Sequence, residues 1–487
     1  MPASTTPAQP TGEAVHAQRI AWVVAGAFFM ETLDGTVIAT ALPAIAHSFG
    51  IQPLDASLGI TVYLVAMAAG VVASGWLAQR WGARRIFVLA LGLFSLSSLL
   101  CALAPGFGAF AGARLTQGLA AAFMSPVGRL VVLRETPKPR IIEALALITW
   151  PGLIAPVVGP PLGGLITTYA SWRWIFLINV PLGVLAIGLV LLLFPARTAE
   201  RPDAPLDAWG LVLTSLSVAA VVLGLSLLAE GQVAPAWSAS VIVMGCLTGA
   251  AAVRHSRLRA DPILDLRPLS HPTYALATAS AGLLSRIAIN ASPFLLPLMF
   301  QMGFGWSAMR AGSMVFPYML GNLAMKAVTT PVLRRFGFRR TLIWNGWLCA
   351  ASLLAIASIP ASLPAAAIAV LLVVAGMTRS MNFTAVNTLA FADVPDALRA
   401  HASALATLCQ QVSIVLGVAV GVLVLGLARN LRGTGALALG DFRWAWAAVG
   451  LLMSVAVLLL YRLPRDTGSA LAAGGPQPAH AGRRGAT

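Results

Sequence analysis

The chain alternates between long apolar segments and short polar loops from residue 20 to residue 461. A bilayer core of about 30 Å requires about 20 helical residues, and about fourteen segments reach that length. They are residues 20–43, 57–78, 86–104, 107–131, 142–167, 174–194, 208–229, 237–253, 273–299, 310–332, 341–359, 365–389, 401–428 and 442–461. The pattern predicts an all-α, polytopic membrane protein. The two weakest segments, 208–229 and 237–253, form a pair, so their loss would leave twelve helices in an unchanged orientation.

The composition agrees with this pattern and excludes several classes of protein. Of the 487 residues 58% are hydrophobic and 10% are charged, against about 25% charged in soluble proteins. The net charge of +16 lies in the loops between apolar segments, which favours membrane orientation over nucleic-acid binding. No GxxxxGK[ST], HExxH or GxSxG motif occurs, and the four cysteines lack metal-ligand spacing. We therefore expect no enzyme activity, no metal and no bound cofactor.

The distribution of basic residues predicts the orientation of the chain. With the N-terminus in the cytoplasm, 22 of the 32 lysines and arginines fall in cytoplasmic segments and five fall outside. Because cytoplasmic loops carry an excess of Lys and Arg, we expect a multi-pass inner-membrane protein with both termini in the cytoplasm.

Two similar sequences indicate an internal duplication. "QRWGARR" (79–85) closes the second apolar segment, and "RRFGFRR" (334–340) closes the tenth. With the weak pair set aside, the tenth segment is the second helix of a second half, as in transporters built from two six-helix bundles. The predicted division is an N-terminal tail (1–18), a six-helix bundle (19–194), a linker with two extra helices (195–272), a second six-helix bundle (273–462) and a disordered cytoplasmic tail (463–487).

The first apolar segment contains two acids, Glu31 and Asp34, near its middle. A carboxylate at the bilayer centre costs about 2.5–3.5 kcal/mol, so such groups face a cavity or a partner. Arg114, in the fourth segment, also requires a partner, which Glu31 or Asp34 can supply. The two acids are three residues apart and therefore share one face of the helix. An acid on that face that is exposed to each side of the membrane in turn can bind and release a proton.

Glycine and proline are concentrated in one segment and at two cytoplasmic turns. Small residues allow close helix contact and prolines remove backbone donors, so the stretch "GLIAPVVGPPLGG" (152–164) is typical of a hinge or a seal. The turns place arginines where they can meet helix C-terminal carbonyls or simply anchor the loop at the membrane. The residues concerned are Gly152, Pro156, Gly159, Pro160, Gly163 and Gly164 in the segment, Gly75, Arg80, Gly82, Arg84 and Arg85 at the first turn, and Arg335, Gly337, Arg339 and Arg340 at the second.

The second half contains bases within its apolar segments. Arg286 and Asn290 lie one turn apart in the ninth segment, and Lys326 lies in the tenth. Arg379 and Asn382 can share a face of the twelfth, whereas Asn387 lies off that face. Each base alone is explained by a backbone carbonyl or by snorkelling to the interface, but three in one half favour a cavity. With Arg114, they outnumber the two acids and favour an anionic substrate.

Five stretches together resemble the signature motifs of the major facilitator superfamily, most closely its fourteen-span EmrB/QacA-type drug:proton antiporters. They are "LDGTVIATALP" (33–43), "GWLAQRWGARR" (75–85), "RLTQGLAA" (114–121), "GLIAPVVGPPLGG" (152–164) and "WRWIFLINVPLG" (172–183). The resemblance implies the major facilitator fold, with Asp34 as the coupling acid, Arg114 as its basic counterpart, residues 159–164 as the antiporter element and the 75–85 loop as a gate. Gln79 stands where the family's loop usually has an acid, so a gating ion pair is expected to be missing.

These features predict a secondary transporter that exports drugs in exchange for protons by alternating access. The proton gradient replaces a cofactor, and Glu31 is either a second proton site or a substrate contact. The expected partners are a small-molecule substrate, protons and the lipid bilayer, with a monomeric transport unit. Export of organic anions is the main alternative, proton symport is a further one, and a channel would not need buried acids or repeated gating loops.

Overall fold

The computed structural model describes residues 12–136, 141–195, 206–230, 233–259, 262–395, 398–433 and 436–464. These residues form an almost entirely helical structure. The helices are α1 (Gly12–Phe49), α2 (Pro53–Ala56), α3 (Leu58–Trp81), α4 (Ala83–Leu103), α5 (Phe107–Glu135), α6 (Ile141–Tyr169), α7 (Trp174–Leu177), α8 (Asn179–Leu193), α9 (Ala208–Glu230), α10 (Pro235–Leu258), η2 (Arg267–Ser270), α11 (Pro272–Thr278), α12 (Ala281–Asn290), α13 (Ser292–Leu298), η3 (Met299–Gly303), α14 (Ala308–Phe336), α15 (Phe338–Ala357), α16 (Ala365–Ala390), α17 (Arg399–Arg432) and α18 (Leu439–Leu460).

Every apolar segment predicted from the sequence coincides with helix. Within the described residues, twelve helical stretches are long and apolar enough to cross a membrane. The twelve do not include α6 and α14, which have 29 residues each and are therefore also long enough to span a bilayer. The polar side chains of Arg310 and Lys326 lower the mean hydropathy of α14. The predicted all-α, multi-pass membrane fold is confirmed.

The ninth predicted segment is broken into several short pieces rather than one helix. Helix α11 ends at Thr278, whose carbonyl accepts a hydrogen bond from Arg286 at 3.3 Å. Pro293 and Pro297 then fall within α13, where each removes a backbone donor. Buried side-chain bonds and prolines therefore interrupt a stretch whose hydropathy alone indicates continuous helix.

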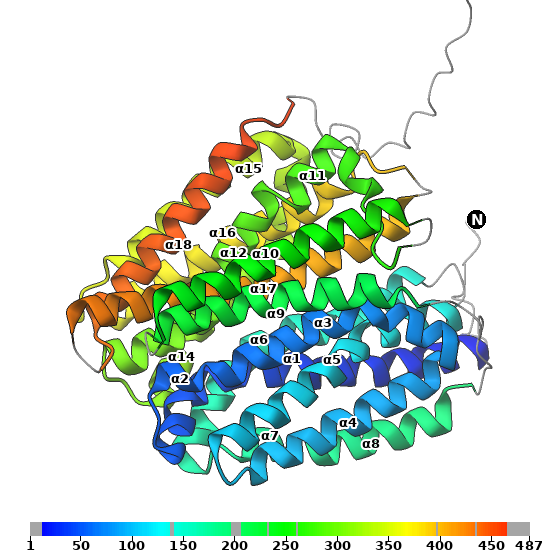
Figure 1. Ribbon diagram of the computed structural model, residues 1–487, viewed down its shortest axis with the longest axis horizontal. Coiled ribbons are helices and arrows are strands. Elements are labelled where there is room, and N and C mark those ends of the chain that lie inside the picture. Colours follow the sequence, from blue (N-terminus) through cyan, green and yellow to red (C-terminus); the bar gives the residue numbers. More distant parts are fainter. Residues whose placement is uncertain are drawn as a thin grey trace, which may run out of the picture.

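The helices form two bundles that lie side by side (Figure 1). Helices α1, α3, α4, α5, α6 and α8 contact one another in the first half, and α11 to α18 do so in the second. Helices α9 and α10 contact each other, and α9 also packs against α3 of the first half and α17 of the second. Two bundles with an extra pair of helices match the predicted architecture, while the domain boundaries remain a prediction.

The bundle has two chemically different ends. The end at which α1 begins also carries Arg80, Arg84, Arg257 and Arg339, and is called the basic end below. The opposite end, where α1 finishes at Phe49, is called the far end. In Figure 1 the basic end is on the right, next to the N label.

Asp207 ties the extra pair of helices together at the basic end. Its carboxylate accepts hydrogen bonds from the backbone N–H groups of Gly210 in α9 and Ile263 beyond α10, both at 3.1 Å. It also lies 2.7 Å from Nε2 of His255 in α10. Burial alone would raise the pKa of Asp207, but the bonds from His255 and the two N–H groups hold this pKa below its ordinary value of 3.8. The carboxylate is therefore charged at neutral pH and joins α9, α10 and the following loop.

Candidate functional site: a buried acid and base in the first half

Asp34 and Arg114 form an ion pair in the interior of the first half. The Arg114 Nη1 atom lies 2.7 Å from Oδ2 of Asp34, and neither side chain is exposed. Arg114 also donates to the carbonyl of Gly59 at 3.2 Å, and its guanidinium lies 4.0 Å from the ring centroid of Tyr63. Helices α1, α3 and α5 thus converge on one charge pair, in which Asp34 supplies the partner that Arg114 requires.

Three further polar side chains complete the surroundings of Asp34. Gln117 Nε2 and Asn179 Nδ2 both donate to Oδ1 of Asp34 at 3.0 Å, and both also donate to the Ser98 hydroxyl. Gln117 Oε1 in turn accepts from Arg114 at 2.5 Å. Within the described residues, Nη2 of Arg114 is the one buried polar side-chain atom of this cluster without a hydrogen-bond partner. The cluster links α1, α4, α5 and α8.

The sequence analysis did not identify Ser98, Gln117 or Asn179. A signal for two of them was present, because Gln117 and Asn179 are polar residues inside the quoted stretches "RLTQGLAA" and "WRWIFLINVPLG". Gln117 also follows Arg114 by three residues, which places the two side chains on one helical face. Ser98 is one of several serines in α4, so its position in the network required the packing of α4 against α5.

Glu31 has a different environment from Asp34. Its Oε2 atom accepts a hydrogen bond from the Ser125 hydroxyl at 2.6 Å, and its side chain is partly exposed. Arg114 pairs with Asp34 rather than with Glu31. Of the two first-span acids, Asp34 is therefore enclosed and Glu31 is the more accessible.

The glycines of α6 let it approach two other helices closely. A Cβ atom at Gly159 or Gly163 would overlap Thr36 or Thr40 of α1, so both glycines are needed for the contact between α1 and α6. Gly152, in contrast, has open space around it. Pro156 lies within the same uninterrupted helix.

The two halves meet at the far end. A Cβ atom at Gly164 of α6 would overlap the backbone of Ala308 in α14, and one at Gly312 would overlap the carbonyl of Pro160. Gln301 in η3 donates to the carbonyl of Thr40 in α1 at 3.0 Å. These three contacts form what we call the far-end seal, which is the geometry expected if the glycine-rich segment closes a pathway.

The two predicted gating loops have the same geometry. Gly82 and Gly337 both have positive φ, 88° and 74°, which glycine adopts without steric cost. Two residues later, Arg84 donates to the carbonyl of Leu191 at 2.6 Å, and Arg339 donates to that of Leu463 at 2.7 Å. Each arginine therefore caps the end of the last helix of its own half, and the repeated sequence folds into a repeated structure.

The other residues of the two predicted gating loops have different surroundings. Arg80 lies over the ring of Trp76 at 5.3 Å, and Arg335 lies over Phe336 at 5.6 Å. Arg85 is exposed, and Gly75 has open space around it. Arg340 lines a cavity of about 680 Å³ between α14, α15 and α16.

The candidate cavity residues of the second half do not form one cluster. Arg286 is buried and donates to Asn387 Oδ1 at 2.7 Å, so Asn387, which lies off the face of Arg379 and Asn382, is its partner. Asn290 donates to the Ser413 hydroxyl of α17 at 3.1 Å. Both side chains are thus committed to helix packing.

Arg379, Asn382 and Lys326 differ from these two. Arg379 is half-buried, its guanidinium lies 5.7 Å from the ring centroid of Tyr318, and its Nε has no hydrogen-bond partner among the described residues. Asn382 is fully buried, and neither of its amide atoms has a partner within the described part of the chain. Lys326 is half-buried in α14. Buried polar atoms are normally hydrogen-bonded, so this part of α16 is suited to a polar ligand.

A two-bundle helical fold with a buried acid and base in its first half is typical of a secondary transporter, and comparisons with known proteins agree. The family model of the Major Facilitator Superfamily matches residues 24–418. The chain therefore belongs to the major facilitator superfamily, and the resemblance of the five sequence motifs is confirmed.

Similar proteins extend over nearly the whole chain. It is 34% identical to "Putative multidrug resistance protein MdtD" of Cronobacter sakazakii, covering 91% of this chain and 94% of that protein. It is 35% identical to the protein of the same description from Serratia proteamaculans, covering 92% and 93%. Among solved structures, a mutant of the nucleoside transporter NupG matches with a TM-score of 0.62 at 13% identity, covering 91% of this chain and 99% of that one. At that identity the match supports the fold alone.

Proposed function

We propose that the protein exports lipophilic small molecules in exchange for protons, as a multidrug:proton antiporter. Membership of the superfamily supports transport by alternating access, and the description of the similar proteins supports drugs as substrates. The observation that carries proton coupling is the enclosed pair of Asp34 in α1 and Arg114 in α5.

Protonation of Asp34 removes the charge on which this cluster is built. A neutral carboxyl group no longer forms an ion pair with Arg114, whereas Arg114 keeps its bonds to the Gly59 carbonyl and to Gln117 and its place over Tyr63. The base therefore stays in position while α1 loses its strongest tie to α5. Deprotonation restores this tie.

Helix α1 carries this change to the contact between the halves. Thr36 and Thr40 lie within two turns of Asp34 and face the glycines of α6, and the Thr40 carbonyl accepts the bond from Gln301. A shift of α1 therefore acts on the far-end seal, where α6 also contacts α14. Rocking of the two bundles then exposes the pathway to one side at a time.

Glu31 is the candidate contact for a cationic substrate. It is the more exposed of the two first-span acids, and its hydrogen bond comes from the neutral hydroxyl group of Ser125. A positively charged lipophilic molecule gains a partner there without competing for Arg114.

We further propose that the basic end faces the cytoplasm of an inner membrane and that the transport unit is one chain. The excess of arginine at that end supports this orientation. The far-end seal would then close the pathway from outside.

Export of organic anions is the second candidate function. Arg379 and Lys326 are half-buried, and the polar atoms of Asn382 are unpaired within the described residues, which suits a carboxylate. Arg114 adds no net charge to this site, because Asp34 neutralises it. Arg286 keeps its charge, but its guanidinium group binds the Thr278 carbonyl and Asn387. The case for an anion is thus weaker than the residue count alone indicates.

Uptake of cationic dyes and of small organic anions into energised inside-out vesicles tests the proposal. We expect dyes to accumulate until an uncoupler collapses the proton gradient, and Arg379→Gln to leave this accumulation within about twofold of the unmodified protein. Accumulation of anions alone, lost in Arg379→Gln, would replace drug export by the second function. Dye accumulation that an uncoupler does not affect would refute proton coupling.

A further inference from the structure

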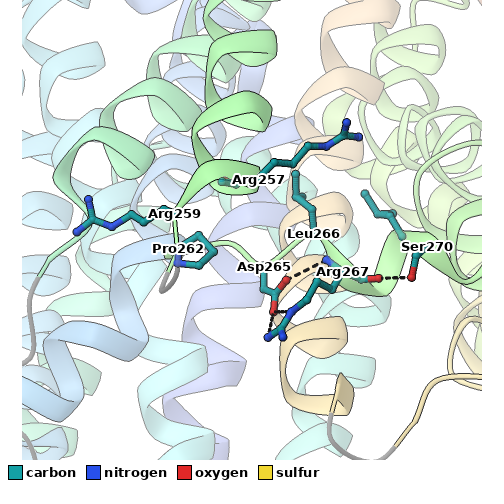
Figure 2. A pocket seen from close by; sticks show the side chains of 9 residues that line it. Arg257, Arg259, Pro262, Asp265, Leu266, Arg267 and Ser270 are labelled. Atoms are coloured by element: carbon teal, nitrogen blue, oxygen red, sulfur yellow. Dashed lines mark hydrogen bonds and ion pairs between the residues drawn. The ribbon is translucent and has the colours of Figure 1, made fainter.

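A cavity of about 470 Å³ lies at the basic end, outside the site described above. It is formed by the end of α10, residues 262–266 and η2 (Figure 2). Its lining includes three arginines, one carboxylate and two serines, namely Arg257, Arg259, Arg267, Asp265, Ser256 and Ser270. The volume and the polar lining are suited to a small anionic group.

The carboxylate in this cavity is already neutralised. Asp265 accepts from Arg267 Nη2 at 2.6 Å, from Arg267 Nε at 2.8 Å and from the Arg267 backbone N–H at 2.9 Å. Nδ1 of His401 lies 3.7 Å from the same carboxylate. The bond from Arg267 lowers the pKa of Asp265, so the pair stays ionised and contributes little net charge.

Arg257 and Arg259 supply the remaining positive charge. Both are exposed, and Figure 2 shows them extending from the end of α10 in different directions. Arg257 has no ion-pair partner among the described residues, and Arg259 Nη1 lies 3.7 Å from Asp207, which His255 also contacts. Both side chains line the cavity and are exposed, so each can turn its guanidinium group toward an anion bound there.

The surface next to the cavity is apolar along the whole of α10. Only 17% of its membrane-spanning window is buried inside the protein, the lowest share among the candidate spans in the described residues. Its exposed large hydrophobic side chains are Trp237, Val243, Met244, Leu247, Val253 and Leu258. Leu258 lies between Arg257 and Arg259 in the sequence, so the apolar face of α10 extends to the basic cavity.

We propose that this cavity binds the phosphate headgroup of an anionic phospholipid whose acyl chains lie along α10. A basic cavity at the end of a lipid-exposed helix fits an amphiphile better than a soluble anion, because both parts of the ligand are matched. Anionic lipids are enriched in the cytoplasmic leaflet, which the basic end is expected to face.

Native mass spectrometry of the full-length protein in nonionic detergent, titrated with phosphatidylglycerol or phosphatidylcholine, tests this site. We expect phosphatidylglycerol to bind more tightly, with about a fivefold loss for each arginine removed in R257Q/R259Q. The matched control is Arg254→Gln, which removes an exposed arginine of the same helix that does not line the cavity. It should bind as tightly as the unmodified protein.

Three results would overturn the proposal. They are equal binding of the two lipids, an equal loss of binding in Arg254→Gln, and displacement of phosphatidylglycerol by millimolar inorganic phosphate, which would indicate a site for soluble anions. Thermal unfolding in lipid-free detergent shows whether each variant is folded. Because binding is measured directly, the result is independent of whether the protein transports drugs.

Discussion

Replacing both members of the Asp34–Arg114 pair should destabilise the protein by less than the sum of the two single replacements. Asp34→Asn leaves a buried guanidinium without its counter-charge, and Arg114→Gln leaves a buried carboxylate without its own. The double variant removes both charges and keeps polar side chains at both positions. The pair is therefore suited to a double-mutant cycle.

The expected loss of stability follows from the geometry of the Asp34–Arg114 pair. Two unit charges 2.7 Å apart attract by roughly 6 kcal/mol at an effective dielectric constant of 20. Desolvation offsets much of this attraction, and breaking a buried pair by removing one partner costs about 3–5 kcal/mol. Asp34 also accepts hydrogen bonds from Gln117 and Asn179, whose amides would lose a charged acceptor. We therefore expect each single replacement to lower the free energy of unfolding by an amount in this range. The double variant should cost at least about 2 kcal/mol less than the sum of the two.

The free energy of unfolding, measured by denaturant titration of the purified protein in mixed micelles, provides the four values of the cycle. Arg85→Gln is the control, because Arg85 is an exposed arginine of helix α4 away from the pair, and its replacement should change stability by less than about 0.5 kcal/mol. Additive effects of Asp34→Asn and Arg114→Gln would refute the reasoning, since they would mean that the two charges do not interact.

Further predictions concern the far-end seal, the second half and the extra helices. Gly164→Ala should destabilise by about 1–3 kcal/mol because the new methyl group meets the backbone of α14, whereas Gly152→Ala, in open space on the same helix, should not destabilise; thermal unfolding compares them. Arg286→Gln should lower stability by about 1–3 kcal/mol, since Asn387 loses its partner, yet change the apparent dye affinity in vesicles by less than twofold. Asp207→Asn should lower the melting temperature at pH 5 to 7. Because the pKa of Asp207 in the folded protein is below its ordinary value of 3.8, the charged carboxylate stabilises the fold at pH values above 3.8. This contribution is lost as the pH falls through the folded-state pKa, so the difference in melting temperature between the two proteins should disappear there. A difference that grows on acidification would contradict this sign.

Hydropathy predicted the positions of the helices because the bilayer imposes length and apolarity on every span. It did not predict the breaks between α11, α12 and α13, which depend on Arg286 binding the Thr278 carbonyl and on prolines within an apolar stretch. The repeated loops were predicted as turns whose arginines either meet helix C-terminal carbonyls or anchor the loop at the membrane. The structure places Arg84 and Arg339 at such carbonyls and gives Gly82 and Gly337 positive φ, a feature that the sequence analysis did not predict.

The candidate site was predicted only in part. A charge inside a span requires a partner, so Asp34 and Arg114 were expected to be close. The identity of the neutral partners, such as Asn179, depends on contacts between helices far apart in the sequence. For the same reason Asn387 was not expected to bind Arg286, because face-sharing arguments apply within one helix and this bond joins two.

Proton movement on addition of substrate to energised inside-out vesicles tests the central role of Asp34 most directly. The unmodified protein should release protons when a cationic dye is added. Asp34→Asn, matched for folded protein and still able to bind the dye, should release none, whereas Glu31→Gln should still release protons at a reduced apparent dye affinity. Dye-driven proton release that persists in Asp34→Asn would contradict the account.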